Sequence, residues 1–336
     1  MSVVIPAFTV DRWRLLERAV TSAQRQTHPP TEVLVCIDRN PDLFERCRHR
    51  WPPDAVEVPP VRVLPATDDD GNTAAADVHR RAHGSYRRFG AGWARNAAAA
   101  AACGDIIAFL DDDAEAAPDW LEHLVAPYRN PTVLAVGGPP LPRYETARPP
   151  WFPGGFDWVF GCAYAGLPAD PGPLRHLIGA NMSVRHSAFK QLGGFRSIDF
   201  DDLDMCMRLE HLLPRSVWYQ PSAVVHHYVP ANRVAWRYFY QRCYFVNREK
   251  VLTFKAMGRA ANLAAERAFV VKLLASGLVR EMRTSGPARW RVVRLAAALV
   301  GIAAAAAGHL AGRIRYLCHP PYAQRLDRDG ARCAMD

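Results

Sequence analysis

The sequence predicts an α/β fold built on a mostly parallel sheet flanked by helices, and three observations carry this prediction. Val3-Val4-Ile5 and the segment from Glu32 to Asp38 are short apolar runs typical of buried strands. Between them, Arg12 to Gln26 has the apolar spacing of an amphipathic helix, and strand, helix, strand is the unit of a parallel sheet with right-handed crossovers. A third apolar run, Ile106 to Leu110, has the length of a strand and ends in three carboxylates.

Those three carboxylates, Asp111, Asp112 and Asp113, stand where a ligand site is expected. Ligands of open α/β sheets bind at the carboxyl ends of parallel strands. Mg²⁺ and Mn²⁺ prefer oxygen ligands and reach phosphates through one or two carboxylates. The triplet therefore indicates a metal-assisted site for a phosphorylated ligand, or else an acidic first turn of the helix expected near Pro118 to Leu124.

A second acidic group opens a helix predicted to begin at Asp201. Asp201 and Asp202 precede an apolar stripe of helical spacing, so they share its first turn. A carboxylate held there beside a metal-bound diphosphate could take a proton from an attacking hydroxyl, whereas the alternative is a plain acidic helix start. Asp204 and Arg208 are expected to form an ordinary i,i+4 ion pair.

A strand candidate from Ala223 ends in His226 and His227. Histidines are more often structural, but imidazole at a strand end is a plausible third metal ligand. Two further regions are expected to be loops. The stretch from Pro65 to Gly92 contains a second acidic triplet with no strand before it. The stretch from Gly137 to Pro173 is rich in aromatic residues, which either line an acceptor pocket or pack in the core.

Composition fits a globular protein with a sizeable core: 336 residues are 49% hydrophobic and 22% charged. Eight scattered cysteines without a Cys-x-x-Cys pair indicate reduced thiols in a cytoplasmic protein, not a disulfide framework or zinc knuckle. A strand that starts at Val3 leaves no room ahead of it for a signal peptide.

The net charge of +9 comes from the C-terminal part. Residues 1–200 hold 21 Lys and Arg against 23 Asp and Glu, whereas residues 201–336 hold 21 against 10. This asymmetry favours an anionic surface such as a membrane over nucleic acid, for which no recognition module is present. An amphipathic helix is expected from Arg259 to Arg283. Residues 295–312 lack Asp, Glu, Lys and Arg, and are expected to span a membrane, lie on its surface, or pack as a soluble helix.

Taken together, these motifs resemble the family 2 glycosyltransferases, which have a GT-A fold. The resemblance runs from Val3 to about Arg248 and rests on five stretches in the family's order: Val3 to Pro6, the strand ending at Asp38, Ala94 to Asn96, Phe109 to Asp113, and Asp201 to Asp204 with Arg208. It implies a nucleotide-sugar transferase domain over residues 1–232. Residues 233–336 would then form a basic, helical, membrane-associated extension.

The resemblance implies roles for particular residues. Those expected to bind the nucleotide-sugar donor are Pro6, Ala7, Asp38, Arg95, Asn96, Asp111, Asp112 and Asn181. Asp113 is implied as the ligand of Mn²⁺ or Mg²⁺, with His226 or His227 beside it. Asp202 falls where the family keeps its general base, with Asp201 in place of the commoner glutamate.

The implied reaction is transfer of one sugar to an acceptor hydroxyl, with inversion and metal assistance. The Gln-x-x-Arg-Trp signature of processive synthases is absent, since Gln241 and Arg242 are adjacent. The acceptor would be lipid-linked or a small metabolite, and the protein cytoplasmic or peripheral on the inner face of the membrane. A sugar nucleotidyltransferase would need a Gly-rich loop where Pro6-Ala7-Phe8 stands. A non-catalytic scaffold of the same fold would not need both Asp113 and Asp202.

Overall fold

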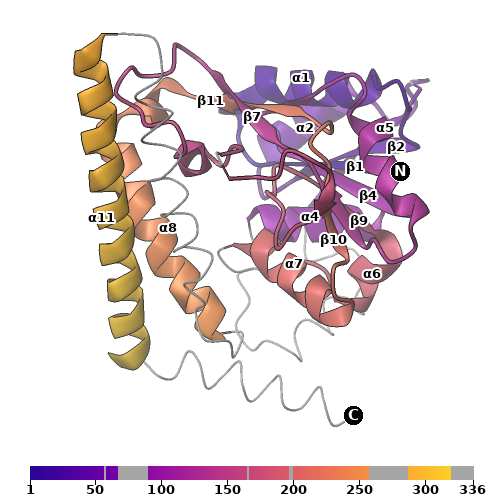
Figure 1. The fold of residues 1–336 in the computed structure, drawn as a ribbon. Coiled ribbons are helices and arrows are strands. Elements are labelled where there is room, and N and C mark those ends of the chain that lie inside the picture. The colour runs from indigo at the N-terminus through magenta and orange to yellow at the C-terminus, as the bar shows by residue number, and fades with distance from the viewer. Residues whose placement is uncertain (57, 67–89, 165, 197–199, 257–286, 319–336) are drawn as a thin grey trace. The chain divides into compact units, whose positions relative to one another are not determined.

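The computed structural model describes residues 1–56, 58–66, 90–164, 166–196, 200–256 and 287–318 (Figure 1). The chain divides into two compact units. Unit 1 gathers the described residues up to Leu141 together with Pro168–Tyr228, and unit 2 gathers Pro142–Leu167 with the described residues from Val229 onward. The division into residues 1–232 and 233–336 stays a prediction. The second acidic triplet, at 68–70, and the helix expected over 259–283 lie outside the described residues.

Unit 1 is built on an eight-stranded sheet. Its strands in spatial order are β3 (Val61–Pro65), β2 (Glu32–Ile37), β1 (Ser2–Ala7), β4 (Ile106–Leu110), β9 (Asn181–Arg185), β6 (Ala135–Gly137), β10 (Val217–Tyr219) and β8 (Gly172–Pro173). The pairs β3–β2, β2–β1, β1–β4 and β6–β10 are parallel, as the sequence predicts. Strand β9 runs antiparallel between β4 and β6.

The direction of β9 matters for the site. Its first residue, Asn181, pairs with Leu110, the last residue of β4. An antiparallel strand begins at the edge where its parallel neighbours end. The loop that leads into β9 therefore lies beside the acidic triplet that follows β4.

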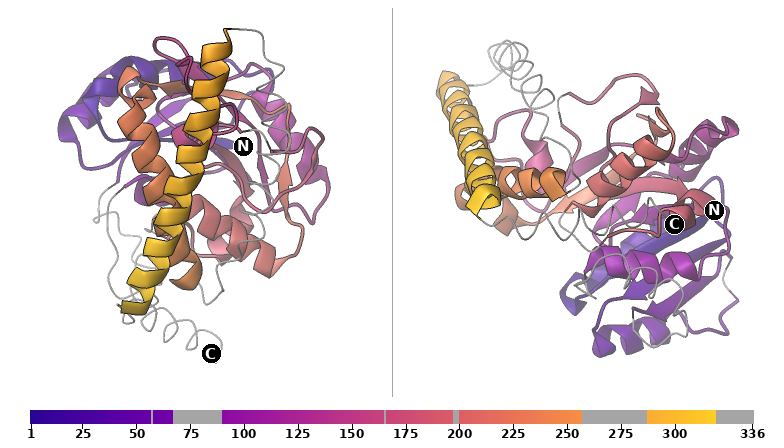
Figure 2. Two further views of the ribbon diagram at one scale, coloured as in Figure 1. Left: turned by 60° about the vertical axis from the view of Figure 1, so that its left-hand side comes forward. Right: turned by 90° about the horizontal axis from the view of Figure 1, so that it is seen from below.

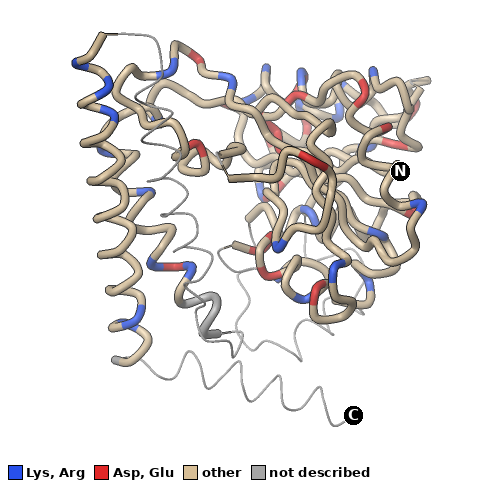
Figure 3. The backbone as a smooth tube through the Cα atoms, in the orientation of Figure 1, with Lys and Arg blue, Asp and Glu red and all other residues tan. Residues whose placement is uncertain are grey.

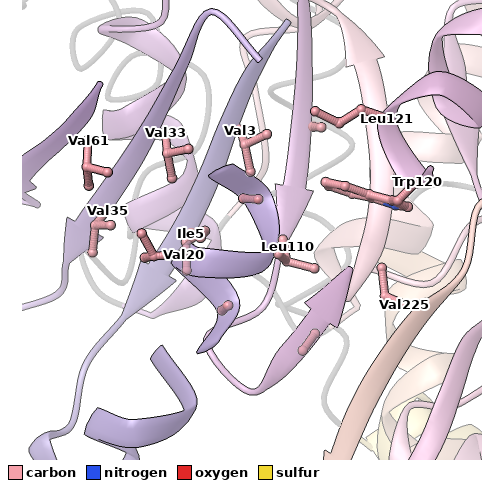
Figure 4. Close-up of a cluster of buried hydrophobic side chains, with 14 of the residues drawn as sticks. Val3, Ile5, Val20, Val33, Val35, Val61, Leu110, Trp120, Leu121 and Val225 are labelled. Atoms are coloured by element: carbon pink, nitrogen blue, oxygen red, sulfur yellow. The ribbon is translucent and has the colours of Figure 1, made fainter. Parts of the chain in front are cut away.

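Helices cover both faces of this sheet (Figure 1). One face packs α1 (Trp13–Gln24), α2 (Pro41–Arg50) and α5 (Trp120–Val125), and the other packs α4 (Ala91–Ala100), α6 (His186–Gln191) and α7 (Asp201–Leu212). Side chains alternate between the two faces along each strand. Thus Val3 and Ile5 point into the cluster of α1, drawn in Figure 4, while Val4 points into the cluster of α4.

The acidic triplet is not the first turn of a helix, because β5 (Ala114–Ala116) follows it directly. Strand β5 belongs to a small sheet of order β5–β11–β7, with β11 at Val225–Val229 and β7 at Pro140–Tyr144. Strands β5 and β11 are antiparallel, and His227 pairs with Ala114. This register sets a histidine next to the end of the triplet.

Unit 2 has its own core, made chiefly of aromatic side chains. Phe152 stacks on Phe160 with ring centroids 4.7 Å apart, and both lie in one buried cluster with Phe239 of α8 (Trp236–Ala256). Phe152, Phe156 and Phe160 of this loop region thus serve as core packing. Helix α11 (Ala288–Cys318) lies alongside α8 in Figures 1 and 2. By length and composition, its segment Ala288–Leu317 is able to cross a membrane.

Four short 3-10 helices complete the described elements. They are η1 (Val10–Arg12), η2 (Ala126–Arg129), η3 (Asp157–Phe160) and η4 (Ala231–Val234). The first of them matters for the site, because it leaves the carboxyl end of β1 at the edge where the acidic triplet lies.

Candidate active site

An acidic and histidine cluster forms at the carboxyl edge of the large sheet. Ligand atoms of Asp111, Asp113 and His227 lie within 4.8 Å of one another. His227 Nε2 is 3.1 Å from Asp113 Oδ1, and both side chains are buried. His226, the preceding residue of β11, is exposed because successive side chains of a strand point to opposite sides. The geometry therefore selects His227 from the predicted pair.

This donor set fits a hard divalent cation. Mn²⁺ and Mg²⁺ prefer carboxylate oxygens, and Mn²⁺ also accepts imidazole. The Asp113 carboxylate is only 6% exposed, and a buried carboxylate is stable only beside positive charge or hydrogen-bond donors. Two carboxylates and one imidazole at this spacing thus suit a bound metal ion.

Arg12, which the sequence analysis missed, reaches the same carboxylates. Its Nη1 lies 2.8 Å from Asp112 Oδ1 and 3.0 Å from Asp113 Oδ2. Burial raises the pKa of Asp112 to about 7, although Arg12 opposes that shift. Burial on its own would lower the pKa of Arg12, but Asp112 and Asp113 outweigh it and raise that pKa. The sequence signal that could have indicated Arg12 is its place shortly after the first strand, since η1 follows β1 at this edge of the sheet.

Arg95 connects this cluster to the second acidic group. Its guanidinium is 6% exposed, donates from Nη2 to Asp111 Oδ1 over 2.7 Å, and lies 3.4 Å by Nη1 from Asp201 Oδ2. Burial would lower the pKa of Arg95, but Asp111 and Asp201 overcome that effect and raise it. The sequence prediction put Arg95 beside the nucleobase or diphosphate. In the structure its guanidinium bridges two carboxylates.

The second acidic group stands in the first turn of α7. Asp202 Oδ2 accepts a hydrogen bond of 2.9 Å from the Gly179 N–H, and Oδ1 accepts one of 2.7 Å from the Leu203 N–H. Burial raises the pKa of Asp201, with Arg95 opposing and Asp202 adding to the shift. Asp202 is half-buried, so its carboxylate is both oriented and reachable.

Close packing at α4 holds this arrangement together. A Cβ on Gly92 would lie 2.6 Å from Asp201 Oδ2, so a side chain at this position would displace that carboxylate. Asn96, one turn later, donates from Nδ2 to the Phe195 carbonyl and accepts from the Phe195 N–H, each over 2.8 Å. The Asn96 amide is thus engaged within the fold, and its role in donor binding stays a prediction.

Several other predicted donor-binding residues lie at the same edge. Pro6 and Ala7 end β1 and are buried, and the Asp38 N–H donates to the Ala7 carbonyl over 2.8 Å. Asp38 Oδ2 accepts from the Gly90 N–H over 2.8 Å. Asp38 therefore joins the end of β2 to the start of α4, next to the site.

Asn181 has a different environment. It is fully buried, its Oδ1 accepts from Trp120 Nε1 over 2.8 Å, and its Nδ2 donates to the Ala223 carbonyl over 2.7 Å. The amide ties β9 to α5 and to the approach of β11. Donor binding by this side chain stays a prediction that the geometry does not favour. Asp204 and Arg208 form the predicted i,i+4 pair, 2.8 Å apart.

Comparisons with known proteins show which proteins this chain is similar to. The family described as Glycosyl transferase family 2 matches residues 80–193. The chain is 27% identical over 237 residues to the glucosyl-dolichyl phosphate glucuronosyltransferase of Haloferax volcanii, with 68% of each chain covered. It is 30% identical over 175 residues to the pre-mycofactocin glycosyltransferase of Mycobacterium tuberculosis, with 48% of this chain and 35% of that protein covered.

A solved structure shares the fold. The mannosyltransferase PcManGT from Pyrobaculum calidifontis, in complex with GDP-Man and Mn²⁺, matches with a TM-score of 0.51 and 17% identity. The match covers 100% of this chain and 87% of that one. The fold is thus of the GT-A type. The relatives and the fold together show that this chain is a glycosyltransferase, and its residues 80–193 match the model of glycosyltransferase family 2.

Proposed function

We propose that this glycosyltransferase moves a single sugar from a nucleoside diphosphate sugar to an acceptor hydroxyl, with inversion and with the help of a divalent cation. The observation that carries the proposal is the bridge made by Arg95. One buried guanidinium contacts Asp111 of the acidic and histidine cluster and Asp201 of the α7 group. The site for a metal-bound diphosphate and the acidic helix start that carries the candidate base thereby share one fixed neighbour.

In this proposal Asp202 is the general base. The N–H groups of Gly179 and Leu203 orient its carboxylate. Asp202 would take the proton from the acceptor hydroxyl as that oxygen attacks the anomeric carbon. A single displacement at that carbon gives inversion, because the acceptor oxygen enters opposite the departing diphosphate.

Asp113 and His227 would hold the cation, with Asp111 as the third group. When bound there, Mn²⁺ or Mg²⁺ would supply positive charge against the charge that grows on the diphosphate leaving group. Arg12 keeps Asp112 and Asp113 paired with a positive charge. We infer that Asp38, Pro6 and Ala7 border the nucleotide, because all three lie at the ends of β1 and β2.

We further infer a lipid-linked acceptor and a position at the inner face of the cytoplasmic membrane. The relative from Haloferax volcanii is named for a dolichyl phosphate acceptor, which supports the acceptor class. Helix α11 supports the membrane location, because it is long and apolar enough to bind a bilayer. The structural relative was solved with GDP-Man and Mn²⁺, which supports a nucleotide-sugar donor and a metal.

Calorimetric binding tests the donor site directly. A panel of nucleoside diphosphates and nucleotide sugars is titrated with Mn²⁺ or Mg²⁺, and again with chelator, into the wild type and Asp113→Ala. We expect one nucleotide to bind only with metal, and Asp113→Ala to lose that dependence. Asp119→Asn, an exposed carboxylate outside the cluster, serves as the control and should bind like the wild type. No metal-dependent binding of any nucleotide would replace the proposal with a non-catalytic scaffold of the same fold.

A further inference from the structure

Helix α11 carries an apolar face that sugar transfer leaves unexplained. Five large apolar side chains lie on the same face of the helix and are strongly exposed: Val292, Leu299, Leu310, Ile314 and Leu317. Leu317 is 74% exposed and Leu310 60%. Exposed alanines lie between them, and no Asp, Glu, Lys or Arg stands between Arg294 and Arg313. We call these residues the apolar face of α11.

The opposite face of α11 is fixed to α8. Its buried residues are small: Ala297, Gly301, Ala304, Gly308 and Gly312. A Cβ on Gly308 would overlap the carbonyl oxygen of Tyr244, and one on Gly312 would lie 2.6 Å from that of Arg248. Backbone contact this close fixes which side of α11 turns away from α8. The apolar face is the side that remains.

The same contacts exclude a simple crossing of a bilayer. Gly301 lies against Phe239, Gly308 against Tyr244 and Gly312 against Arg248, so the two helices run in the same direction side by side (Figure 2). Helix α8 therefore follows the charge-free stretch of α11, and Arg242, which lies between Phe239 and Tyr244 in α8, comes alongside the middle of that stretch. If α11 spanned the membrane, the charge of Arg242 would enter the hydrocarbon, which is strongly unfavourable.

Charge at the ends of α11 indicates what covers the apolar face. Arg289, Arg313 and Arg315 are exposed and flank the stretch, and Figure 3 shows basic residues at both ends of the helix and none along its middle. The charge-free stretch is about 27 Å long at the rise of an α-helix. Apolar surface between basic ends is the pattern of a helix lying in the interface of an anionic bilayer.

We propose that α11 lies flat in an anionic membrane surface, with its apolar face among the acyl chains and its terminal arginines at the headgroups. This deepens the membrane location inferred above and does not depend on sugar transfer. Its test measures binding alone, so the proposal and the transferase reaction can fail separately.

Flotation of the full chain with vesicles tests the docking. The probes are phosphatidylcholine vesicles with and without phosphatidylglycerol. Wild type should float with the anionic vesicles, and Leu299→Asp with Leu310→Asp should lower the bound fraction at least about tenfold. The matched control is Val56→Asp with Leu212→Asp, two exposed apolar positions in unit 1. It adds the same negative charge and should float like the wild type.

Two outcomes of this experiment would overturn the docking. One is a wild type that does not float with anionic vesicles. The other is a variant that floats as well as the wild type. If the wild type is a dimer by light scattering, and the same two substitutions make it a monomer without changing flotation, the face joins two copies of the chain instead.

Depth measurements test the flat orientation. Spin labels are placed at Val292→Cys, Leu299→Cys and Leu310→Cys, in a chain with Cys103, Cys318 and Cys333 changed to serine. A flat helix gives the same shallow depth at all three sites. A crossing helix gives its greatest depth at Leu299 and shallower depth at Val292, and that gradient would exclude the flat orientation.

Discussion

At Asp202, two backbone N–H groups donate to the two carboxylate oxygens, whereas the amide of Asp202→Asn accepts only one of these hydrogen bonds and has no basicity. Asp202→Asn should lower turnover roughly 10²- to 10⁴-fold, the usual contribution of general base catalysis. Nucleotide affinity should not change, because the acidic and histidine cluster is intact. Product formation and calorimetry measure the two quantities separately.

Asp119→Asn is the control for that prediction, since it removes an exposed carboxylate of unit 1. It should leave turnover unchanged. Wild-type turnover in Asp202→Asn would remove Asp202 from the role of base. A loss of nucleotide affinity in the same variant would mean that the side chain serves the donor site.

The adjacent histidines offer a matched pair of variants. His227 faces Asp113 at 3.1 Å, whereas His226 is exposed on the other side of β11. His227→Ala should weaken Mn²⁺ binding at least roughly tenfold, because loss of a residue that only hydrogen-bonds to a metal ligand already lowers metal affinity by that factor. His226→Ala should bind Mn²⁺ like the wild type. Titration of the paramagnetic ion followed by electron spin resonance measures both, and equal affinities would remove His227 from the site.

Much of the site could be predicted from the sequence at the residue scale. Asp38 and Asp111 follow buried strands, and the ends of parallel strands gather at one edge, so their place at the same edge of the sheet could be predicted. The choice between His226 and His227 could not, because it depends on the pairing of β11 with β5. The bridge from Arg95 to Asp201 could not be predicted either, since it joins residues 106 positions apart.

The packing of helix α11 against helix α8 depends on glycines, which have no side chain to separate the two backbones. Any side chain at Gly308 would overlap the Tyr244 carbonyl and force the helices apart. Gly308→Leu should therefore lower the thermal unfolding temperature. Ala307→Leu adds the same volume at an exposed position and should leave it nearly unchanged. Calorimetric unfolding compares the two, and equal transitions would contradict the packing.

Element directions were harder to predict than element positions. Strand and helix patterns report periodicity, and periodicity does not tell which way a strand runs. The antiparallel course of β9 was not anticipated, although Asn181 to Val184 reads as a strand. That course delivers Gly179 to the site edge, where its N–H meets Asp202. Strand β5 was also missed, because three residues are too few for a pattern.

At the scale of the whole molecule, burial should decide which of the described thiols react with a reagent in solution. Burial raises the pKa of Cys47 and of Cys206 to about 12, so both stay protonated at neutral pH. Cys103 is exposed. Native protein treated with a chromogenic disulfide reagent should therefore react quickly at Cys103 and slowly at Cys206.

Two serine variants check this reactivity. Cys103→Ser should remove one equivalent from the fast phase, and Cys206→Ser should leave the fast phase unchanged. If Cys206→Ser diminished the fast phase, the core around α7 would be open to reagents. The measurement therefore reports on the integrity of the fold as well as on the thiols.

The shared guanidinium of Arg95 has a thermodynamic consequence. A single positive charge divided between Asp111 and Asp201 links their free energies. Positive charge that arrives at Asp111 competes with Arg95 there and leaves more of its attraction for Asp201. Linkage makes this effect reciprocal. Binding of a cation or donor at Asp111 therefore changes the stability of the carboxylate arrangement at the start of α7, and that arrangement changes the affinity at Asp111. The preference for which substrate enters first can thus be encoded in one side chain.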